Sequence, residues 1–498
     1  MILINPGYNR EQKLGAFSRY VPLSVPMGIG YLAAYLKKHD CKVQIIDEEV
    51  TPLSDALLCE YTKNLERPYI FGISALTAGI ERAYRVADIL KEKYPECKVL
   101  FGNVHPTVLP EEVLSHQSVD LVVRGEAEEI LTELYYRMKN HQDYQDIKGI
   151  SFRKNGQIVH NEPSPLPDLK KIPPFPYHLF EQFAGQYDFG FVASSRGCPF
   201  NCIFCSQRSI SGRQYRFFPA DVVVHSMEEI ILKYKRSYIG FVDDLFIINK
   251  ARVFELCEMI RKKGLHKKGM FDCQARGDFV DEEILTTLKA SGFRTLHFGI
   301  ETASERLMKL INKKETVAQV VGGIKLAKKI GLRVSGTFIL GLPTETREER
   351  RAAYRLAKEL SLDYVRFNNA TPYPGTELYN IAVKENRLNP GKNWENLNAC
   401  GTLVESPFKE NPLAYVPLGT SERVLRCDIL KYNLFYSFRL QSIIKILRER
   451  IAAGAWLTLP EKWYFKIEEW IYLIKFAFRI LFSFGKVFLY SILTMFER

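Results

Sequence analysis

The stretch SSRGCPFNCIFCSQ, residues 194–207, places three cysteines within eight positions. Cys198, Cys202 and Cys205 follow the spacing CxxxCxxC. A structural zinc site needs four ligands, commonly from two paired cysteine or histidine elements. The cluster contains no histidine, and no second cysteine pair lies near it in the sequence. A 4Fe–4S cluster suits the count better, because three thiolates hold three irons and leave the fourth iron open to bind another molecule.

The remaining composition is that of an ordinary globular chain. Its 498 residues are 46% hydrophobic and 25% charged, and this length favours two or three domains over one core. The other seven cysteines are scattered singly, which favours a reducing compartment over a disulfide framework. The first residues show no basic segment followed by an apolar run and a cleavage site, so we expect the protein to stay in the cytoplasm.

The order of apolar runs predicts where the first domain ends. From residue 1 to 145, short apolar runs alternate with helical patterns, which is typical of βαβ units and a parallel sheet. Residues 146–185 are predicted to be a linker, because six prolines lie between Asn161 and Tyr177. Proline cannot continue a helix or pair within a central strand.

The same alternation resumes over residues 186–395, with six candidate strands separated by helical stretches. Six βα units predict a partial barrel whose site lies at the carboxyl ends of the strands. The cysteines follow the first of these strands, Asp243 and Asp244 end the second, and Glu301 ends the fourth. Residues 396–498 lose the βα rhythm and form a helical, hydrophobic and basic region.

The three cysteines after a barrel strand resemble those of the radical S-adenosylmethionine (SAM) superfamily. The resemblance implies a partial (βα)6 TIM-like barrel and a 4Fe–4S cluster on Cys198, Cys202 and Cys205, whose open iron takes the amino and carboxylate groups of SAM. It also implies a set of SAM contacts: Phe204 near the adenine, Asp243 and Asp244 at the amino group, Glu301 at the ribose or methionine part, and Gly341 and Pro343 near the adenine.

Simpler roles remain open for some of these residues. A carboxylate pair such as Asp243 and Asp244 can also cap the helix after its strand. Glu301 can also be a solvated or salt-bridged side chain. For the aspartate pair the simpler role is favoured by the pair alone, and convergence of the motifs on one rim of the barrel brings the functional role level with it.

Three kinds of α/β domain can precede such a barrel: a flavodoxin-like electron donor, a methylthiotransferase-type domain and a cobalamin-binding domain. Methylthiotransferases carry three further cluster cysteines here, but Cys41, Cys59 and Cys97 lie on helical or strand-like stretches. The segments GISALT (72–77), LFGNVHPTVLPEEVL (100–114) and DLVVRGEAEEIL (120–131) together resemble cobalamin-binding domains fused to radical SAM barrels. The resemblance implies a Rossmann-like domain that binds cobalamin.

That resemblance assigns a group of small residues to the cobalamin region: Ser74, Ala75, Gly102 and Asn103, at the carboxyl ends of strands, would make room for the nucleotide tail. One feature departs from the free-standing family, because the loop NPGYNREQKLG contains no histidine for the cobalt. His105 lies in the second segment. We favour a loop-orienting or substrate-facing role for His105 over cobalt ligation.

The carboxyl-terminal tail predicts an amphipathic helix. Residues 421–498 hold 13 of the Lys and Arg residues against 7 Asp and Glu, within a net charge of +12. Charges between Glu468 and Glu497 fall on one helical stripe, and they interrupt any run long enough to span a membrane. A helix at a membrane interface and a helix buried against the barrel or a partner subunit both fit, and the wide apolar arc favours the first. Gly485 is a candidate break in this helix.

Together these resemblances imply an anaerobic, cobalamin-dependent radical SAM enzyme that forms a 5′-deoxyadenosyl radical. We favour methylation of an unactivated carbon in a small, hydrophobic or lipid-like molecule. The same architecture resembles the anaerobic magnesium-protoporphyrin monomethyl ester cyclase, so oxidative cyclisation of a tetrapyrrole or lipid-like substrate stays open. A third alternative is a redox sensor or lipid-binding scaffold that holds a cluster without turnover.

The expected partners follow from this chemistry. An electron donor such as flavodoxin or ferredoxin would reduce the cluster, and the tail favours peripheral contact with the cytoplasmic membrane face. Nucleic acid is not expected, because no arginine-rich stripe with interleaved aromatic residues lies along the barrel motifs.

Overall fold

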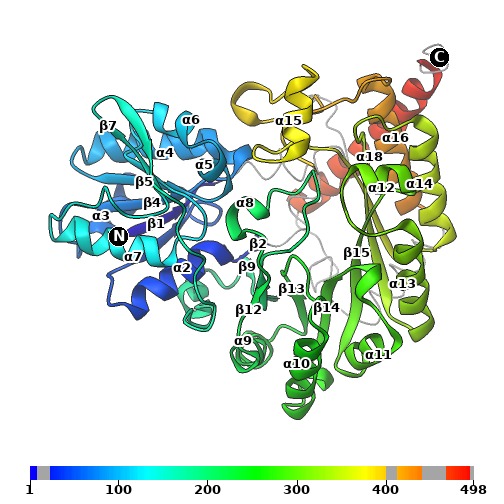
Figure 1. Cartoon of the computed structure of the whole chain (residues 1–498), viewed down its shortest axis with the longest axis horizontal. Coiled ribbons are helices and arrows are strands. Elements are labelled where there is room, and N and C mark those ends of the chain that lie inside the picture. Colours follow the sequence, from blue (N-terminus) through cyan, green and yellow to red (C-terminus); the bar gives the residue numbers. More distant parts are fainter. Residues whose placement is uncertain (8–22, 400–411, 440–466, 494–498) are drawn as a thin grey trace.

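A computed structural model describes residues 1–7, 23–399, 412–439 and 467–493. Figure 1 shows two α/β parts lying side by side, the first in blue and cyan and the second in green. The first helix that follows residue 412, in orange, lies against the side of the second part that is away from the first part. The predicted succession of two α/β regions and a helical region is confirmed.

The first part is built on one seven-stranded sheet. Its strands in spatial order are β3 (Gln44–Asp47), β1 (Ile2–Asn5), β4 (Ile70–Ser74), β5 (Lys98–Gly102), β6 (Leu121–Val123), β7 (Ile150–Lys154) and β8 (Gln157–His160). The five strands from β3 to β6 are parallel. The helices between them are α2 (Met27–Lys38), α3 (Asp55–Thr62), α4 (Ile80–Lys93), α5 (Val104–Val108), α6 (Pro110–Ser115) and α7 (Glu128–Lys139).

Both faces of this sheet are covered, which explains the continuous apolar runs in its strands. Successive strand residues point to opposite faces. Leu3 therefore packs with α2 and α7, whereas its neighbours Ile2 and Ile4 pack with α3 and α4. Burial on both faces is the usual state of a parallel sheet.

The linker predicted over residues 146–185 is wrong for its first part. Strands β7 and β8 form an antiparallel hairpin that extends the first sheet beyond residue 145. The turn between them is Asn155–Gly156, and both residues have positive φ, as a two-residue hairpin turn requires. The alternating pattern around this Asn-Gly pair was the signal for a hairpin.

The proline-rich part of the linker packs between the two α/β parts. Leu169, Ile172 and Phe175 are buried in the core of the second part. The Phe175 ring fills the space beside Gly30 of α2, where an added Cβ would lie 2.2 Å from a ring carbon. This segment therefore joins the two parts as a packed layer.

The second part is the predicted six-stranded partial barrel. Its strands, all parallel, are β10 (Phe191–Val192), β13 (Tyr238–Phe241), β14 (Met270–Ala275), β15 (Phe293–Glu301), β16 (Arg333–Leu340) and β17 (Tyr364–Asn369). The main covering helices are α9 (Ala220–Leu232), α10 (Lys250–Lys262), α11 (Glu282–Ala290), α13 (Val317–Ile330) and α14 (Arg347–Glu359). The shorter helices α12 (Glu305–Leu310) and α15 (Glu377–Lys384) follow β15 and β17.

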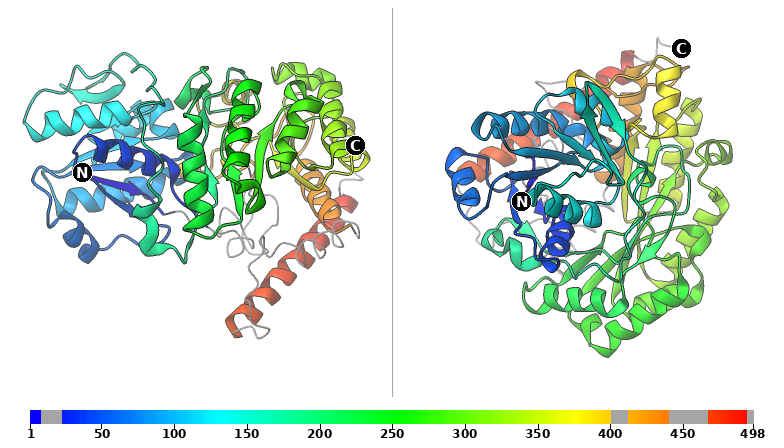
Figure 2. Two further views of the ribbon diagram at one scale, coloured as in Figure 1. Left: turned by 90° about the horizontal axis from the view of Figure 1, so that it is seen from below. Right: turned by 60° about the vertical axis from the view of Figure 1, so that its left-hand side comes forward.

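Two helices of the carboxyl-terminal region are described. Helix α16 (Glu422–Ser437) packs on β17, and buried Arg350 of α14 donates to Asp428 of α16 at 2.9 Å. Helix α18 (Ile467–Leu493) runs through Gly485 without a break, so the suggested break there is wrong. Figure 2 (left) shows α18, in red, extending away from the barrel. The rest of region 396–498, at 400–411, 440–466 and 494–498, lies outside the described residues.

Candidate functional site

The cysteine loop begins one short strand later than the sequence indicated. Strand β10 ends at Val192, and β11 (Ser195–Arg196) then pairs antiparallel with β12 (Arg216–Phe217) before the first cysteine. Gly197 joins β11 to Cys198 with a φ of +85°. An added Cβ on Gly197 would lie 2.2 Å from the carbonyl oxygen of Gln214, so this junction requires glycine.

The three cysteines of the loop fit an iron–sulfur cluster. All three are free and partly buried. Burial raises the pKa of the Cys202 thiol to about 12, while the nearby Lys313 and Arg276 favour its thiolate. In the described part of the chain no group of His, Cys, Asp or Glu side chains converges on a single ion. A cubane does not need such convergence, because it places each thiolate on a different iron.

The barrel holds this loop in place through its backbone. The amide of Ile203 donates to the carbonyl of Ile311 at 3.1 Å, and the amide of Leu378 donates to the carbonyl of Ile203 at 2.8 Å. The guanidinium of Arg276 lies 3.7 Å from the centre of the Phe200 ring. The loop is therefore anchored to the end of α12, to the first turn of α15 and to the residue that follows β14.

Asp243 and Asp244 follow β13 but have different surroundings. Asp243 is buried and accepts hydrogen bonds from the amide of Ser194 at 3.2 Å and from its hydroxyl at 2.8 Å. The Asp244 carboxylate instead faces the neighbouring cavity and accepts from the amide of Gly197 at 3.2 Å. Loss of hydration raises the pKa of Asp244 to about 6. Neither residue caps the next helix, whose first turn is capped by Asn249.

Glu301 ends β15 in a constrained position. It has a φ of +62° and is 7% exposed. Its carboxylate is paired with the ammonium of Lys313 at 2.7 Å, so the salt-bridged role weighed from the sequence is present. Lys313 also donates to the carbonyl of Gly299. Left-handed backbone at a residue other than glycine is uncommon, and it aims the Glu301 side chain back beneath the strand end.

The remaining residues assigned to SAM lie around the same rim. Phe204 packs on the barrel core, partly buried, and Pro343 is buried. Gly341 has a φ of +83°, and an added Cβ would lie 2.7 Å from the Leu425 side chain of α16. Its amide donates to Glu345. The space beside Gly341 thus belongs to the packing of α16.

A cavity of about 270 Å³ lies between the two α/β parts. The first part contributes mainly apolar walls, including Leu3, Ile29, Leu32, Leu100, Val123 and Leu131. The barrel contributes more polar ones, including Ser195, Arg196, Gln207, Ser211 and Asp244. The cavity is smaller than a corrinoid, so a bound cobalamin would extend beyond these residues.

The strand ends of the first sheet open onto this cavity. Ser74, Gly102 and Asn103 line it, whereas Ala75 is buried in the sheet core. Asn103, with a φ of +84°, caps α5 and donates to the Ser74 hydroxyl at 2.9 Å. Small side chains at the carboxyl edge of a parallel sheet are the setting in which such sheets bind ligands, and this setting fits the nucleotide side of a corrinoid.

His105 does not line the cavity. Its ring is fully buried, with Nε2 at 3.5 Å from Glu112 Oε1, and it meets the Trp394 ring edge to face at 5.5 Å. The indole nitrogen of Trp394 donates to the same Glu112 oxygen at 3.0 Å. The ring is therefore packed against Glu112 and Trp394, and the loop-orienting or substrate-facing role of His105 stays a prediction.

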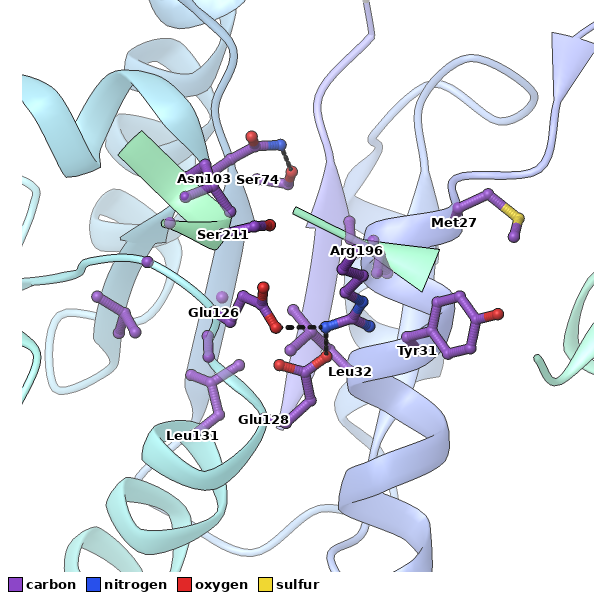
Figure 3. Close-up of a pocket in the computed structure, with 18 of the residues that line it drawn as sticks. Met27, Tyr31, Leu32, Ser74, Asn103, Glu126, Glu128, Leu131, Arg196 and Ser211 are labelled. Carbon is purple, nitrogen blue, oxygen red and sulfur yellow. Dashed lines mark hydrogen bonds and ion pairs between the residues drawn. The ribbon is translucent and has the colours of Figure 1, made fainter. Parts of the chain in front are cut away.

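A cluster of buried charges lines the cavity and was not predicted from the sequence; Figure 3 draws its members Arg196, Glu126 and Glu128. Arg196 donates to Glu126 at 2.9 Å and to Glu128 at 2.7 Å. Arg216 is also paired with Glu126. The segments RGEAEE and SSRG were noted for other reasons, and their opposite charges were the available signal.

Family comparisons agree with this division of the chain. Residues 192–357 match the radical SAM superfamily, and residues 19–135 match the B12 binding domain. An uncharacterised methyltransferase of Pyrococcus horikoshii is 34% identical over 423 residues, which cover 82% of this chain and 91% of that protein. The anaerobic magnesium-protoporphyrin IX monomethyl ester cyclase of Rubrivivax gelatinosus is 28% identical, over 71% of this chain and 65% of the cyclase.

A solved structure has a similar fold over most of the chain. The radical SAM methyltransferase TsrM of Kitasatospora setae, with cobalamin and a 4Fe–4S cluster bound, superposes with a TM-score of 0.66. The match covers 84% of this chain and 82% of that one, at 17% identity. At that identity the likeness supports the fold.

Proposed function

Because this chain belongs to the radical SAM enzymes that carry an amino-terminal B12-binding domain, we propose that it methylates an unactivated carbon of a hydrophobic small molecule. One observation carries the proposal. The cavity has Asp244, Arg196 and Gln207 on one side, the last two directly before and after the cysteine loop, and the open edge of the first sheet on the other. A substrate there would therefore lie between the two halves of the chemistry.

The chain is a cobalamin-dependent radical SAM enzyme of the methyltransferase family, with a 4Fe–4S cluster, SAM and cobalamin as cofactors. When bound, these groups supply the electron for SAM cleavage and a transferable methyl group. The protein positions the reacting groups and excludes water. In the balanced reaction a substrate C–H becomes C–CH3, and two SAM molecules and two electrons give deoxyadenosine, methionine and S-adenosylhomocysteine.

We assign roles to the residues of the barrel rim. Cys198, Cys202 and Cys205 hold the cluster. Asp244 takes the amino group of SAM, because its carboxylate faces the cavity beside the cluster loop. Asp243 orients that loop through Ser194. The two aspartates therefore differ in role. Asp244 faces a ligand, whereas the hydrogen bonds of Asp243 are satisfied within the protein.

Three further barrel residues and one aromatic ring complete the SAM side. Glu301, held by Lys313, faces the ribose or methionine part of SAM. Phe204 is placed near the adenine by its position beside Cys205. Gly341 and Pro343 shape the end of β16, although the contact of Gly341 with Leu425 favours a packing role for that glycine.

The first domain would hold the corrinoid at the strand ends. Ser74, Gly102 and Asn103 line the cavity and leave space for the nucleotide tail. The wall beyond them is mostly aliphatic, as ligand sites for apolar molecules commonly are. This wall supports a hydrophobic substrate.

The decisive experiment is anaerobic reconstitution of the full chain with iron, sulfide and hydroxocobalamin, followed by SAM, a strong reductant and a lipid extract. We expect a bound corrinoid spectrum and deoxyadenosine and S-adenosylhomocysteine in equal amounts. Cys202→Ala should abolish deoxyadenosine. Deoxyadenosine without S-adenosylhomocysteine would favour oxidative cyclisation, for which the relative from Rubrivivax gelatinosus is the precedent. Absence of both products would favour a sensor or scaffold. A flavodoxin or ferredoxin is the proposed natural electron donor.

A second proposal concerns the tail, because α18 has one packed face and one exposed face. Phe484 and Val487 pack on α16. The opposite face exposes large apolar side chains, among them Ile474 at 64%, Leu481 at 69% and Phe488 at 70%. At about 100° per residue, Arg479 and Lys486 fall on one edge of this strip. No helix among the described residues is long and apolar enough to cross a membrane.

We propose that the strip lies in the surface of an anionic membrane, since exposed apolar residues flanked by cations are typical of interfacial helices. The double variant Leu481→Glu/Phe488→Glu should lose sedimentation with anionic phosphatidylglycerol vesicles. Val383→Glu, at a side chain 51% exposed on α15, is the matched control and should bind as the wild type does. Equal binding by all three proteins would contradict the proposal.

A further inference from the structure

The charge cluster beneath the cavity joins the two cofactor-binding halves directly. Glu126 lies in the turn between β6 and α7, and Glu128 is the first residue of α7. Arg196 and Arg216 lie in the β11–β12 ribbon, before and after the cysteine loop. These four side chains contribute equal numbers of positive and negative charges. The cluster is therefore internally neutralised and does not itself call for a charged ligand.

Burial makes these ion pairs sensitive to the relative position of the paired side chains. The glutamate side chains are 3% exposed and the arginine side chains 16%. Burial alone would raise the pKa of Glu126, but the hydrogen bond from Arg216 and the charge of Arg196 outweigh it and hold that pKa below its ordinary value. Charges this deeply buried are tolerated only when each one stays in contact with its oppositely charged partner.

Aromatic rings from both halves fix the same guanidinium. Arg196 lies 5.2 Å from the ring centre of Tyr31 in α2 and 5.7 Å from that of Phe218 after β12. The two rings stack on each other at 5.3 Å. Arg196 therefore has contacts with the first domain through Tyr31, Glu126 and Glu128, and with the barrel through Phe218.

The segment that connects Arg196 to the cluster loop is short and tightly packed. Only Gly197 separates Arg196 from Cys198, and its amide donates to Asp244. The same glycine packs against Gln214 so closely that an added Cβ would lie 2.2 Å from that carbonyl. On the other side, Gly125 and Glu126 follow β6 and line the cavity. A displacement at Arg196 would thus move the cluster loop relative to the sheet edge.

We propose that Arg196, Glu126, Glu128 and Arg216 form an interdomain joint that sets the position of the iron–sulfur cluster relative to the cobalamin. These are positioning residues, since they act through Gly197 and the β6 turn. The inference rests on the proposed function for its purpose, because abstraction of hydrogen and delivery of methyl must reach one carbon. A misplacement of about 1 Å can cost about a hundredfold in rate.

The test measures geometry, using the full chain loaded with iron, sulfide and cobalamin and reduced to the cobalt(II) state. The dipolar coupling between the reduced cluster and cobalt(II) reports their separation in the electron paramagnetic resonance spectrum. We expect one well-defined coupling in the wild type, and a weaker, broader one in Arg196→Gln and in Glu126→Gln/Glu128→Gln at unchanged iron and corrinoid content. Arg196→Lys keeps the charge without the two-pronged guanidinium and should fall between.

The matched control is Glu133→Gln, which removes an exposed ion pair of α7 with Arg137 and should leave the coupling unchanged. Coupling identical to the wild type in Arg196→Gln and in the double glutamine variant would overturn the inference. If Arg196→Gln does not fold, Arg196→Lys and Glu128→Gln carry the same comparison.

Failure of the proposed function gives a different result. If the wild type binds no corrinoid, the function is wrong, and calorimetry of the protein carrying the cluster alone then tests the joint. A joint predicts that the wild type unfolds in one transition and that the double glutamine variant unfolds in two. One shared transition in both proteins would overturn it.

Discussion

The Asp244 carboxylate accepts a hydrogen bond of 3.2 Å from the amide of Gly197, the residue immediately before the first cluster cysteine. This bond links the end of the second barrel strand to the cysteine loop. Asp243, one residue earlier, faces inward and is satisfied by Ser194 and Ser195. Two adjacent carboxylates therefore have different surroundings, and the separate roles proposed for them can be tested.

Substitution of the two aspartates should separate binding from stability. Asp244→Asn should keep the fold and the iron content but weaken SAM binding, measured by equilibrium dialysis, by about tenfold, the cost of one charged contact. Asp243→Asn should lower the free energy of unfolding by about 1–3 kcal/mol, because it disturbs a buried hydrogen-bond network. Equal SAM affinity in Asp244→Asn and the wild type would contradict the assigned role.

Each cluster cysteine should be required for the iron. Cys198→Ser, Cys202→Ser and Cys205→Ser should each lose most of the iron and the charge-transfer absorbance after reconstitution, because the cluster depends on all three thiolates. Cys59→Ser is the matched control, since Cys59 is exposed on α3. Iron retained by any of the three serine variants would show that the cluster is held elsewhere.

Substitution of His105 should leave the ligands of the cobalt unchanged. Its ring is buried against Trp394 and does not line the cavity. His105→Gln should therefore bind cobalamin with the wild-type visible spectrum and without change in the nitrogen splitting of the cobalt(II) resonance. Its unfolding midpoint should fall, because the contacts with Glu112 and Trp394 are lost. A nitrogen splitting present in the wild type and absent in His105→Gln would instead make His105 a cobalt ligand.

The free energy of unfolding should fall as the pH rises from about 4.5 to 8, because of the titration of Glu345. Burial raises the pKa of this carboxyl from 4.5 to about 8, although Gly341 and Arg350 oppose the shift. In that window the folded protein holds a proton that the unfolded chain releases, so unfolding becomes easier with rising pH. Glu345→Gln should remove this component, measured as the difference between its unfolding midpoint and that of the wild type from pH 5 to 9.

Glu348→Gln provides the control for this pH series, because the Glu348 side chain is 63% exposed in the first turn of α14, which begins two residues after Glu345. Its midpoint should follow that of the wild type at every pH. A difference between wild type and Glu345→Gln that is constant with pH would show that Glu345 does not titrate in this window.

Local patterns carried much of the fold. The spacing of Cys198, Cys202 and Cys205 and the βα alternation are properties of consecutive residues, so they could be recognised without coordinates. The hairpin at Asn155–Gly156 also has a local signal, which is the Asn-Gly pair itself. A linker was predicted there instead because of the prolines that follow it. The short strand β11 was missed because two residues carry no periodicity.

Contacts between distant residues could not be predicted in the same way. Nothing in the sequence around Gly341 indicates Leu425, which lies 84 positions later and fills the space beside it. The burial of His105 against Trp394 also depends on a segment from the far end of the barrel. For α18, periodicity predicted the stripes but could not say that one face would pack on α16 while the opposite face stayed exposed.

Residue types and their spacing along single strands, loops and helices were enough to predict the two α/β regions, the three cluster cysteines and the radical SAM chemistry. The packed structure was needed to show that Asp243 faces inward while Asp244 lines the cavity, and that Arg196 pairs with Glu126 and Glu128. Burial and ion pairing depend on distances between segments, and those distances exist only after the two cores have packed together.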